Sequence, residues 1–160
     1  MGLFSFIKNA GAKIFKKKEK SAPESAPTAA PMTEEQMDIQ ALTAEVDKIN
    51  IKIDDMNLIM GKSVAVHGRT ATNADREKII LALGNVEGIC VVEDYIDVTN
   101  PEPKATFYTV EKGDTLSKIA KTQYGDPMKY PVIFEANKPM LSHPDKIYPG
   151  QKLRIPAEVA

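Results

Sequence analysis

The chain has 160 residues, enough for one ordinary domain or two small ones, and its 42% hydrophobic and 27% charged residues are typical of a globular protein. The formal net charge is −1, so no overall electrostatic field attracts nucleic acid or anionic surfaces. A single cysteine, Cys90, excludes an intramolecular disulfide framework and a cysteine-based zinc cluster.

The N-terminal segment, residues 1–17, combines apolar residues with lysines. The apolar residues from Leu3 to Phe15 gather on one side of a helical projection, which predicts a short amphipathic helix over residues 3–15. Its apolar face has two possible partners, the rest of the protein or an anionic membrane surface. We favour the first, because two small domains leave apolar surface that needs cover.

The same segment lacks the features of an export signal. Lys8 interrupts the apolar run early, the positive charges follow the run, and no small-residue cleavage site ends it. No window of the chain approaches the roughly 20 apolar residues that span a bilayer. We therefore expect a cytoplasmic protein without stable membrane insertion.

Residues 18–31 are rich in Ser, Ala and Pro and predict a flexible linker. Residues 32–99 predict an α-β-β-α-β unit, which begins with a capping box formed by Thr33 and Gln36. The later elements are period-two runs at 51–53 and 58–60 around a turn at 55–57, a strand at 63–68, a helix at 72–83 and a strand from 89 to 98.

A stiff linker at 100–105 precedes a second unit at 106–157, which predicts the order β-α-α-β. Its elements are a strand at 107–110, a helix that Asp114 or Thr115 caps and that runs to about 122, a helix at 130–136 and a strand at 152–155. The expected fold class is therefore α+β, with two small domains after a short amphipathic helix.

The second unit resembles the LysM family at two places, residues 108–120 (YTVEKGDTLSKIA) and 147–156 (IYPGQKLRIP). The first unit resembles a BON domain, with Gly68, Gly84 and Gly88 at the places that this family requires. Together with the N-terminal residues MGLF, the order of BON and LysM domains is similar to that of the bacterial cytoplasmic potassium-binding protein family.

Two segments offer main-chain carbonyls that can leave helix or sheet hydrogen bonding, residues 7–12 and residues 84–89. Selective potassium sites present several neutral carbonyl oxygens, and the C-terminal end of a helix favours a cation. From the residues alone, Gly84 is more simply a helix C-cap and Gly88 an ordinary strand entry. The resemblance implies that the two segments share a potassium ion. The implied carbonyl ligands are Ile7, Ala10, Ala12, Gly84, Val86 and Ile89.

The expected function is selective potassium binding or sensing, in which the ion compacts the BON and LysM domains. Rb⁺ and Cs⁺ should substitute for K⁺ and Na⁺ should not, because of their sizes. The partner that would detect the ion-bound form stays unknown. The alternative is a cell-envelope adaptor, with LysM on peptidoglycan and the N-terminal helix or BON domain on phospholipid.

LysM modules generally bind glycans that contain N-acetylglucosamine, and the resemblance places a groove between residues 113–116 and 137–147. The polar and flat apolar groups of this groove would be Asp114, Asn137, Tyr148 and Pro139. A cytoplasmic chain meets no mature cell wall, so we favour a LysM domain that serves as a regulatory or docking partner of the BON domain.

Three other chemistries have little support. The carboxylates at 54–55 and 93–97 predict a solvated acidic face rather than a divalent-cation site, because no D-x-D-x-D-G loop is present. Neither histidine has a nucleophile or carboxylate at an informative spacing, so we do not expect an enzyme. The basic run 16–18 lacks interleaved aromatic residues, so we expect no nucleic-acid partner.

Overall fold

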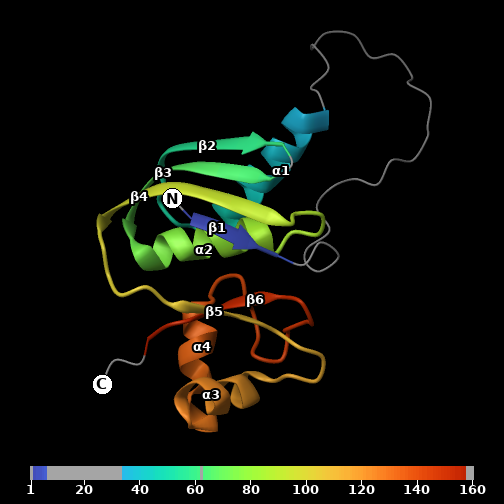
Figure 1. The fold of residues 1–160 in the computed structure, drawn as a ribbon, viewed down its shortest axis with the longest axis vertical. Coiled ribbons are helices and arrows are strands. Elements are labelled where there is room, and N and C mark those ends of the chain that lie inside the picture. Colours follow the sequence, from blue (N-terminus) through green and yellow to red (C-terminus); the bar gives the residue numbers. More distant parts are fainter. Residues whose placement is uncertain (1, 7–33, 62, 158–160) are drawn as a thin grey trace, which may run out of the picture.

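A computed structural model describes residues 2–6, 34–61 and 63–157, which form two packed units, one above the other (Figure 1). The first unit comprises the elements from β1 to β4 and the second those from β5 to β6. The elements are β1 (Gly2–Ser5), α1 (Glu34–Lys48), β2 (Asp54–Met60), β3 (Val64–Thr72), α2 (Asn73–Gly84), β4 (Val91–Asn100), β5 (Thr106–Thr109), α3 (Leu116–Tyr124), η1 (Pro127–Lys129), α4 (Tyr130–Ala136) and β6 (Lys152–Ile155).

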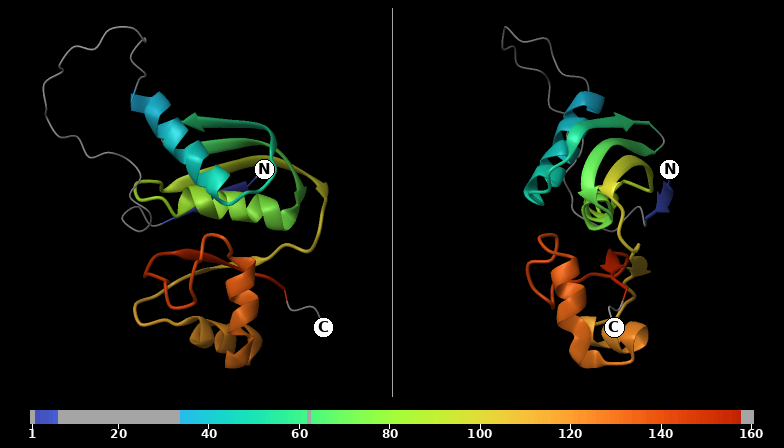
Figure 2. Two further views of the ribbon diagram at one scale, coloured as in Figure 1. Left: turned by 180° about the vertical axis from the view of Figure 1, so that it is seen from behind. Right: turned by 90° about the vertical axis from the view of Figure 1, so that its left-hand side faces the viewer.

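The first unit is a four-stranded sheet of order β1-β4-β3-β2, with α1 and α2 on one side of it (Figure 2). Strands β3 and β4 are parallel and α2 is the crossover between them, while the other two pairs are antiparallel. Thr72 caps α2 by accepting a hydrogen bond from the Asp75 main-chain N–H at 3.2 Å. The core that these elements share is built from Leu42, Val46, Ile49, Leu58, Val64, Val66, Ile79, Ile80, Ala82, Leu83, Val86, Ile89, Val92 and Ile96.

The first described residues of the chain form strand β1, so the predicted helix over residues 3–15 is wrong for residues 3–6. Strand β1 pairs antiparallel with β4, in a register that runs from Gly2 opposite Asp94 to Ser5 opposite Val91. The side chains alternate, with Phe4 half-buried against the core and Leu3 71% exposed. This alternation is typical of a strand, and β1 is the edge strand of the sheet, paired with β4. The rest of that predicted helix and the predicted linker 18–31 lie outside the described residues.

Residues 55–57, predicted as a turn, belong to β2 instead. The pairing of β2 with β3 shifts register between Asp54 and Asn57. Asp55 there has a φ of +55°, in the left-handed region. A β-bulge places local turn conformation inside a continuous strand, which explains why turn-forming residues occur there.

The second unit has the predicted β-α-α-β order, with α3 and α4 against the antiparallel pair β5–β6. Of the two candidate caps, Thr115 caps α3, and its hydroxyl accepts a hydrogen bond from the Lys118 main-chain N–H at 3.2 Å. Gly125 ends α3 in the left-handed conformation, with a φ of +74°. The mixed helices and strands of both units confirm the α+β class.

Candidate functional site

The C-terminal end of α2 leads into a tight turn, residues 84–89. The Ile89 main-chain N–H donates to the Val86 carbonyl at 3.1 Å, and Gly88 has a φ of +102°, which favours glycine. The side chains of Val86 and Ile89 are both buried in the core of the first unit. The buried side chains therefore fix the positions of the main-chain oxygens in this turn.

The N-terminal segment packs directly on the turn. The Phe6 ring lies against Gly84, where an added Cβ would come within 2.0 Å of the ring. The Phe6 main-chain N–H donates to the Cys90 carbonyl at 2.7 Å. Gly84 is the last residue of α2 and Asn85 is the C-cap, so the expectation of a glycine C-cap is wrong; the missing side chain makes room for Phe6.

Three of the predicted ion ligands lie together in this turn, namely Gly84, Val86 and Ile89. The other three, Ile7, Ala10 and Ala12, lie outside the described residues. Phe6 nevertheless contacts the turn 84–89. Phe6 immediately precedes residues 7–12, the other segment with predicted ligands. The Val86 oxygen that accepts the Ile89 N–H retains a second lone pair for a cation.

The second unit contacts the same turn through β6. The Asn85 side chain pairs with the main chain of Lys152, accepting from its N–H at 2.9 Å and donating to its carbonyl at 2.9 Å. The Lys152 ammonium donates to the Ser5 carbonyl at 2.5 Å and lies 5.0 Å from the centre of the Phe6 ring. Burial lowers the pKa of Lys152. Lys152 therefore contacts both the turn and the N-terminal strand.

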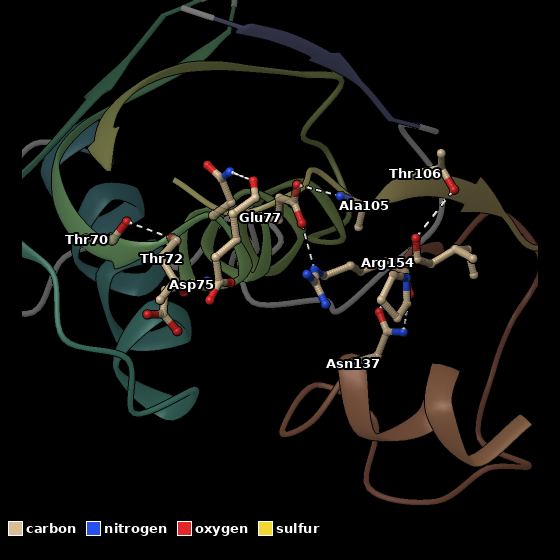
Figure 3. A network of polar contacts seen from close by, with 12 residues as sticks. Thr70, Thr72, Asp75, Glu77, Ala105, Thr106, Asn137 and Arg154 are labelled. Carbon is tan, nitrogen blue, oxygen red and sulfur yellow. Dashed lines mark hydrogen bonds and ion pairs between the residues drawn. The ribbon is translucent and has the colours of Figure 1, made fainter. Parts of the chain in front are cut away.

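Helix α2 also contacts the second unit through a buried ion pair (Figure 3). The Glu77 carboxylate accepts from Arg154 Nε at 2.7 Å and from the Ala105 main-chain N–H at 3.1 Å. The side chains of Glu77 and Arg154 are only 7% and 11% exposed. Because an unpaired buried charge is costly, this pair fixes where β6 lies on α2.

Asn137 is a structural residue of the second unit, so its prediction as a glycan contact is wrong. Its side chain is fully buried and bonds the main chain of Arg154 twice, through the carbonyl at 2.8 Å and the N–H at 2.7 Å. It also donates to the Ile133 carbonyl at 2.7 Å. These three bonds leave the amide facing the protein interior, where no sugar can reach it.

The other three residues of the predicted glycan groove, Asp114, Tyr148 and Pro139, have different surroundings. Asp114 accepts a hydrogen bond from the Tyr108 hydroxyl at 2.8 Å, which raises the pKa of Tyr108 to about 12. Burial raises the pKa of Tyr148 to about 12. Tyr148 and Pro139 line a cavity of about 330 Å³ between the two units. Its walls are Glu45, Lys48, Ile49, Ala82, Asn85, Pro139, Met140, Tyr148 and Gln151.

The carboxylates that predicted a solvated acidic face do not all face solvent. Asp94 is fully buried, forms an ion pair with Arg76 and accepts from the Ile96 main-chain N–H at 3.0 Å. The prediction is therefore wrong for Asp94. Within the described ranges, His, Cys, Asp and Glu side chains form no group of three or more that could hold a metal ion. The helices of those ranges include none with the length and apolar character to span a bilayer.

Comparison with known proteins gives a domain family for the second unit and a relative for the whole chain. Residues 108–156 match the LysM domain family. The chain is 43% identical over 158 residues to a protein of Escherichia coli O6:H1 (strain CFT073) named potassium binding protein Kbp. The alignment covers 99% of this chain and 100% of that protein. The chain belongs to the Kbp family. The predicted resemblances to a potassium-binding family and to LysM are thus confirmed.

Two further proteins match this Kbp-family chain over a shorter stretch. An uncharacterized protein of Deinococcus radiodurans is 59% identical over 51 residues, which is 32% of this chain and 19% of that protein. The uncharacterized protein YqbP of Bacillus subtilis is 43% identical over 58 residues, 31% of this chain and 26% of that protein. For the Kbp-family chain itself, the BON resemblance of the first unit and the cytoplasmic location stay predictions.

Asn85, Lys152 and Glu77 were not predicted as site residues of this Kbp-family chain. In the sequence Asn85 served only to end a helix, and the other two are charged residues of the kind that usually face solvent. The contact between Asn85 and Lys152 joins positions 67 residues apart, which no local spacing can indicate.

Proposed function

We propose that this chain binds potassium selectively between its N-terminal segment and the turn 84–89. The observation that supports this most directly is the packing of Phe6, the residue before Ile7 in the sequence, on Gly84 of the turn. The name of the Escherichia coli relative, a potassium binding protein, supports the same ligand. The proposed ligands are the main-chain oxygens of Ile7, Ala10, Ala12, Gly84, Val86 and Ile89.

The chemistry of the turn suits a large, weakly hydrated monovalent cation. Neutral carbonyl oxygens replace water around such an ion without the charge density that favours divalent ions. The turn follows the C-terminal end of α2, where the helix dipole adds partial negative charge. Because the buried side chains of Val86 and Ile89 hold the turn, its oxygens resist contraction around a smaller ion. Rb⁺ and Cs⁺ therefore substitute for K⁺, and Na⁺ does not.

Ion binding would favour a compact arrangement of the two units. An ion whose ligands come from two segments stabilises the form in which those segments meet. The first unit then acts as a BON domain that holds the ion, and the LysM domain docks on it. In this proposal the protein is a cytoplasmic potassium sensor without catalytic activity.

The test is a titration of metal-free protein with KCl, in which choline chloride keeps the ionic strength constant. Binding is measured by calorimetry and by amide chemical shifts. We expect saturable heat, shifts in residues 7–12 and 84–89, similar responses to RbCl and CsCl, and none to NaCl. Equal affinity for Na⁺ would reject the selectivity. Absence of heat and of shifts with KCl would reject the function.

The LysM match favours a second candidate, a cell-envelope adaptor that binds peptidoglycan glycans and phospholipid. The burial of Asn137 and the position of Tyr148 beside the first unit weigh against an open sugar groove. The two candidates predict different ligands. Binding of N-acetylglucosamine oligomers together with fractionation into the envelope would support the adaptor, whereas a protein found only in cytosol would remove it.

A further inference from the structure

Asn85 belongs to the turn through its main chain, but its side chain contacts the second unit. Its main chain lies between Gly84 and Val86, two proposed ion ligands. Its side chain leaves the first unit and pairs with Lys152 of β6 through two hydrogen bonds of 2.9 Å. The Tyr148 hydroxyl of the second unit lies 3.5 Å from the Asn85 carbonyl oxygen.

The paired bonds make Asn85 a substitute for a neighbouring strand. Strand β6 belongs to a two-stranded sheet with β5, so one of its edges has no strand partner within the second unit. The N–H and C=O of one strand residue point to the same side, and a carboxamide offers one acceptor and one donor that fit this pair. Loss of the side chain would leave two main-chain groups of β6 without these partners.

Lys152 adds a second connection to the same region. Its ammonium is bonded to the Ser5 carbonyl in β1 and lies near the Phe6 ring, which packs on Gly84. The main chain of one β6 residue is thus bound to the turn and its side chain to the N-terminal strand. The turn of the proposed ion site and the strand β1, which precedes the other proposed ligands in the sequence, therefore both contact the LysM domain at Lys152.

We propose that Asn85 couples potassium binding to docking of the LysM domain, as a positioning residue that contributes no ligand through its side chain. This inference rests on the proposed function of the turn. When β6 holds the Asn85 side chain, the flanking carbonyls of Gly84 and Val86 are held as well. By linkage, an ion that holds those carbonyls strengthens the contact with β6 by the same factor.

The experiment compares full-length wild type with Asn85→Ala, which keeps every main-chain oxygen of the turn. Each lost hydrogen bond contributes about one kcal/mol, so we expect potassium affinity to fall by about three- to thirtyfold. The potassium-induced shifts of the turn amides should remain, while those of Lys152 and Leu153 should disappear. Asn57→Ala, at an exposed asparagine of β2, is the matched control and should keep wild-type affinity.

A second measurement needs no variant. The Lys152 main-chain N–H donates to Asn85, so its hydrogen exchange in wild type reports the contact directly. We expect saturating KCl to slow this exchange several-fold relative to choline chloride. If wild type binds potassium, an unchanged exchange rate or an unchanged affinity in folded Asn85→Ala overturns the coupling alone. If wild type gives no potassium heat, the proposed function fails with it.

Discussion

The absence of a side chain at Gly84 allows the N-terminal segment to reach the end of α2. An alanine there would put its Cβ 2.0 to 2.2 Å from three carbons of the Phe6 ring, so the ring must move. We expect Gly84→Ala to lower the free energy of unfolding by about 1–3 kcal/mol, even though alanine favours the helix. Because Phe6 leads into the proposed ligand segment, potassium affinity should fall too. Urea unfolding and calorimetry measure the two effects.

Gly61→Ala provides the matched control for this substitution. Gly61 follows β2 on the surface, and a Cβ there would meet only the Ser63 carbonyl oxygen, at 3.9 Å. The free energy of unfolding of this variant should stay within about 0.5 kcal/mol of wild type. If Gly84→Ala behaves like Gly61→Ala in both measurements, Phe6 does not pack on Gly84 in solution.

Most elements could be predicted because their patterns are local. Thr72 and Thr115 are recognisable helix caps, and the hydroxyl of each accepts a hydrogen bond from the main-chain N–H three residues later. Strand β1 could not be predicted in this way, since closely spaced apolar residues fit a helical stripe as well as alternation. The choice is made by the free edge of β4, about 90 residues further along the chain, and no local pattern contains that information.

The strand can be tested with two neighbouring residues of β1. Phe4 packs against the core of the first unit, and its ring lies edge-on to the Phe107 ring, with 5.2 Å between the ring centres. Leu3, in contrast, is 71% exposed. We expect Phe4→Ala to lower the free energy of unfolding by about 1–3 kcal/mol. Leu3→Ala is the control and should change it by less than about 0.5 kcal/mol. Equal losses in urea unfolding would contradict the alternation of β1.

At the scale of the whole molecule, the two units could be predicted but their contact could not. Main-chain ligands leave no pattern of side chains, so the proposed ion site could be inferred from the sequence only through a family resemblance. Asn137 shows a limit of the resemblance itself, because the LysM family suggested a sugar contact at this residue. Its burial depends on β6, whose Arg154 main chain it bonds from 17 positions away.

The buried pair of Glu77 and Arg154 is the strongest candidate for holding the two units together. Glu77→Gln leaves Arg154 without its charged partner in the interface, where it is 11% exposed, and weakens the acceptor of the Ala105 N–H beside the linker. Breaking a buried pair costs about 3–5 kcal/mol. We therefore expect the units to unfold in separate thermal transitions, followed through methyl resonances of each core, and KCl to bring the transitions closer together.

Glu135→Gln is the control for charge removal. Glu135 of α4 pairs with Lys138, which follows the helix, and the two side chains are 64% and 45% exposed. Exposed pairs contribute about 0–1 kcal/mol, so this variant should keep one transition near the wild-type temperature. Coincident transitions in Glu77→Gln would show that the pair does not join the units. In that case docking would depend on the contacts of Lys152 with Asn85 of the turn and with Ser5 of β1, and the Asn85→Ala variant would separate the transitions instead.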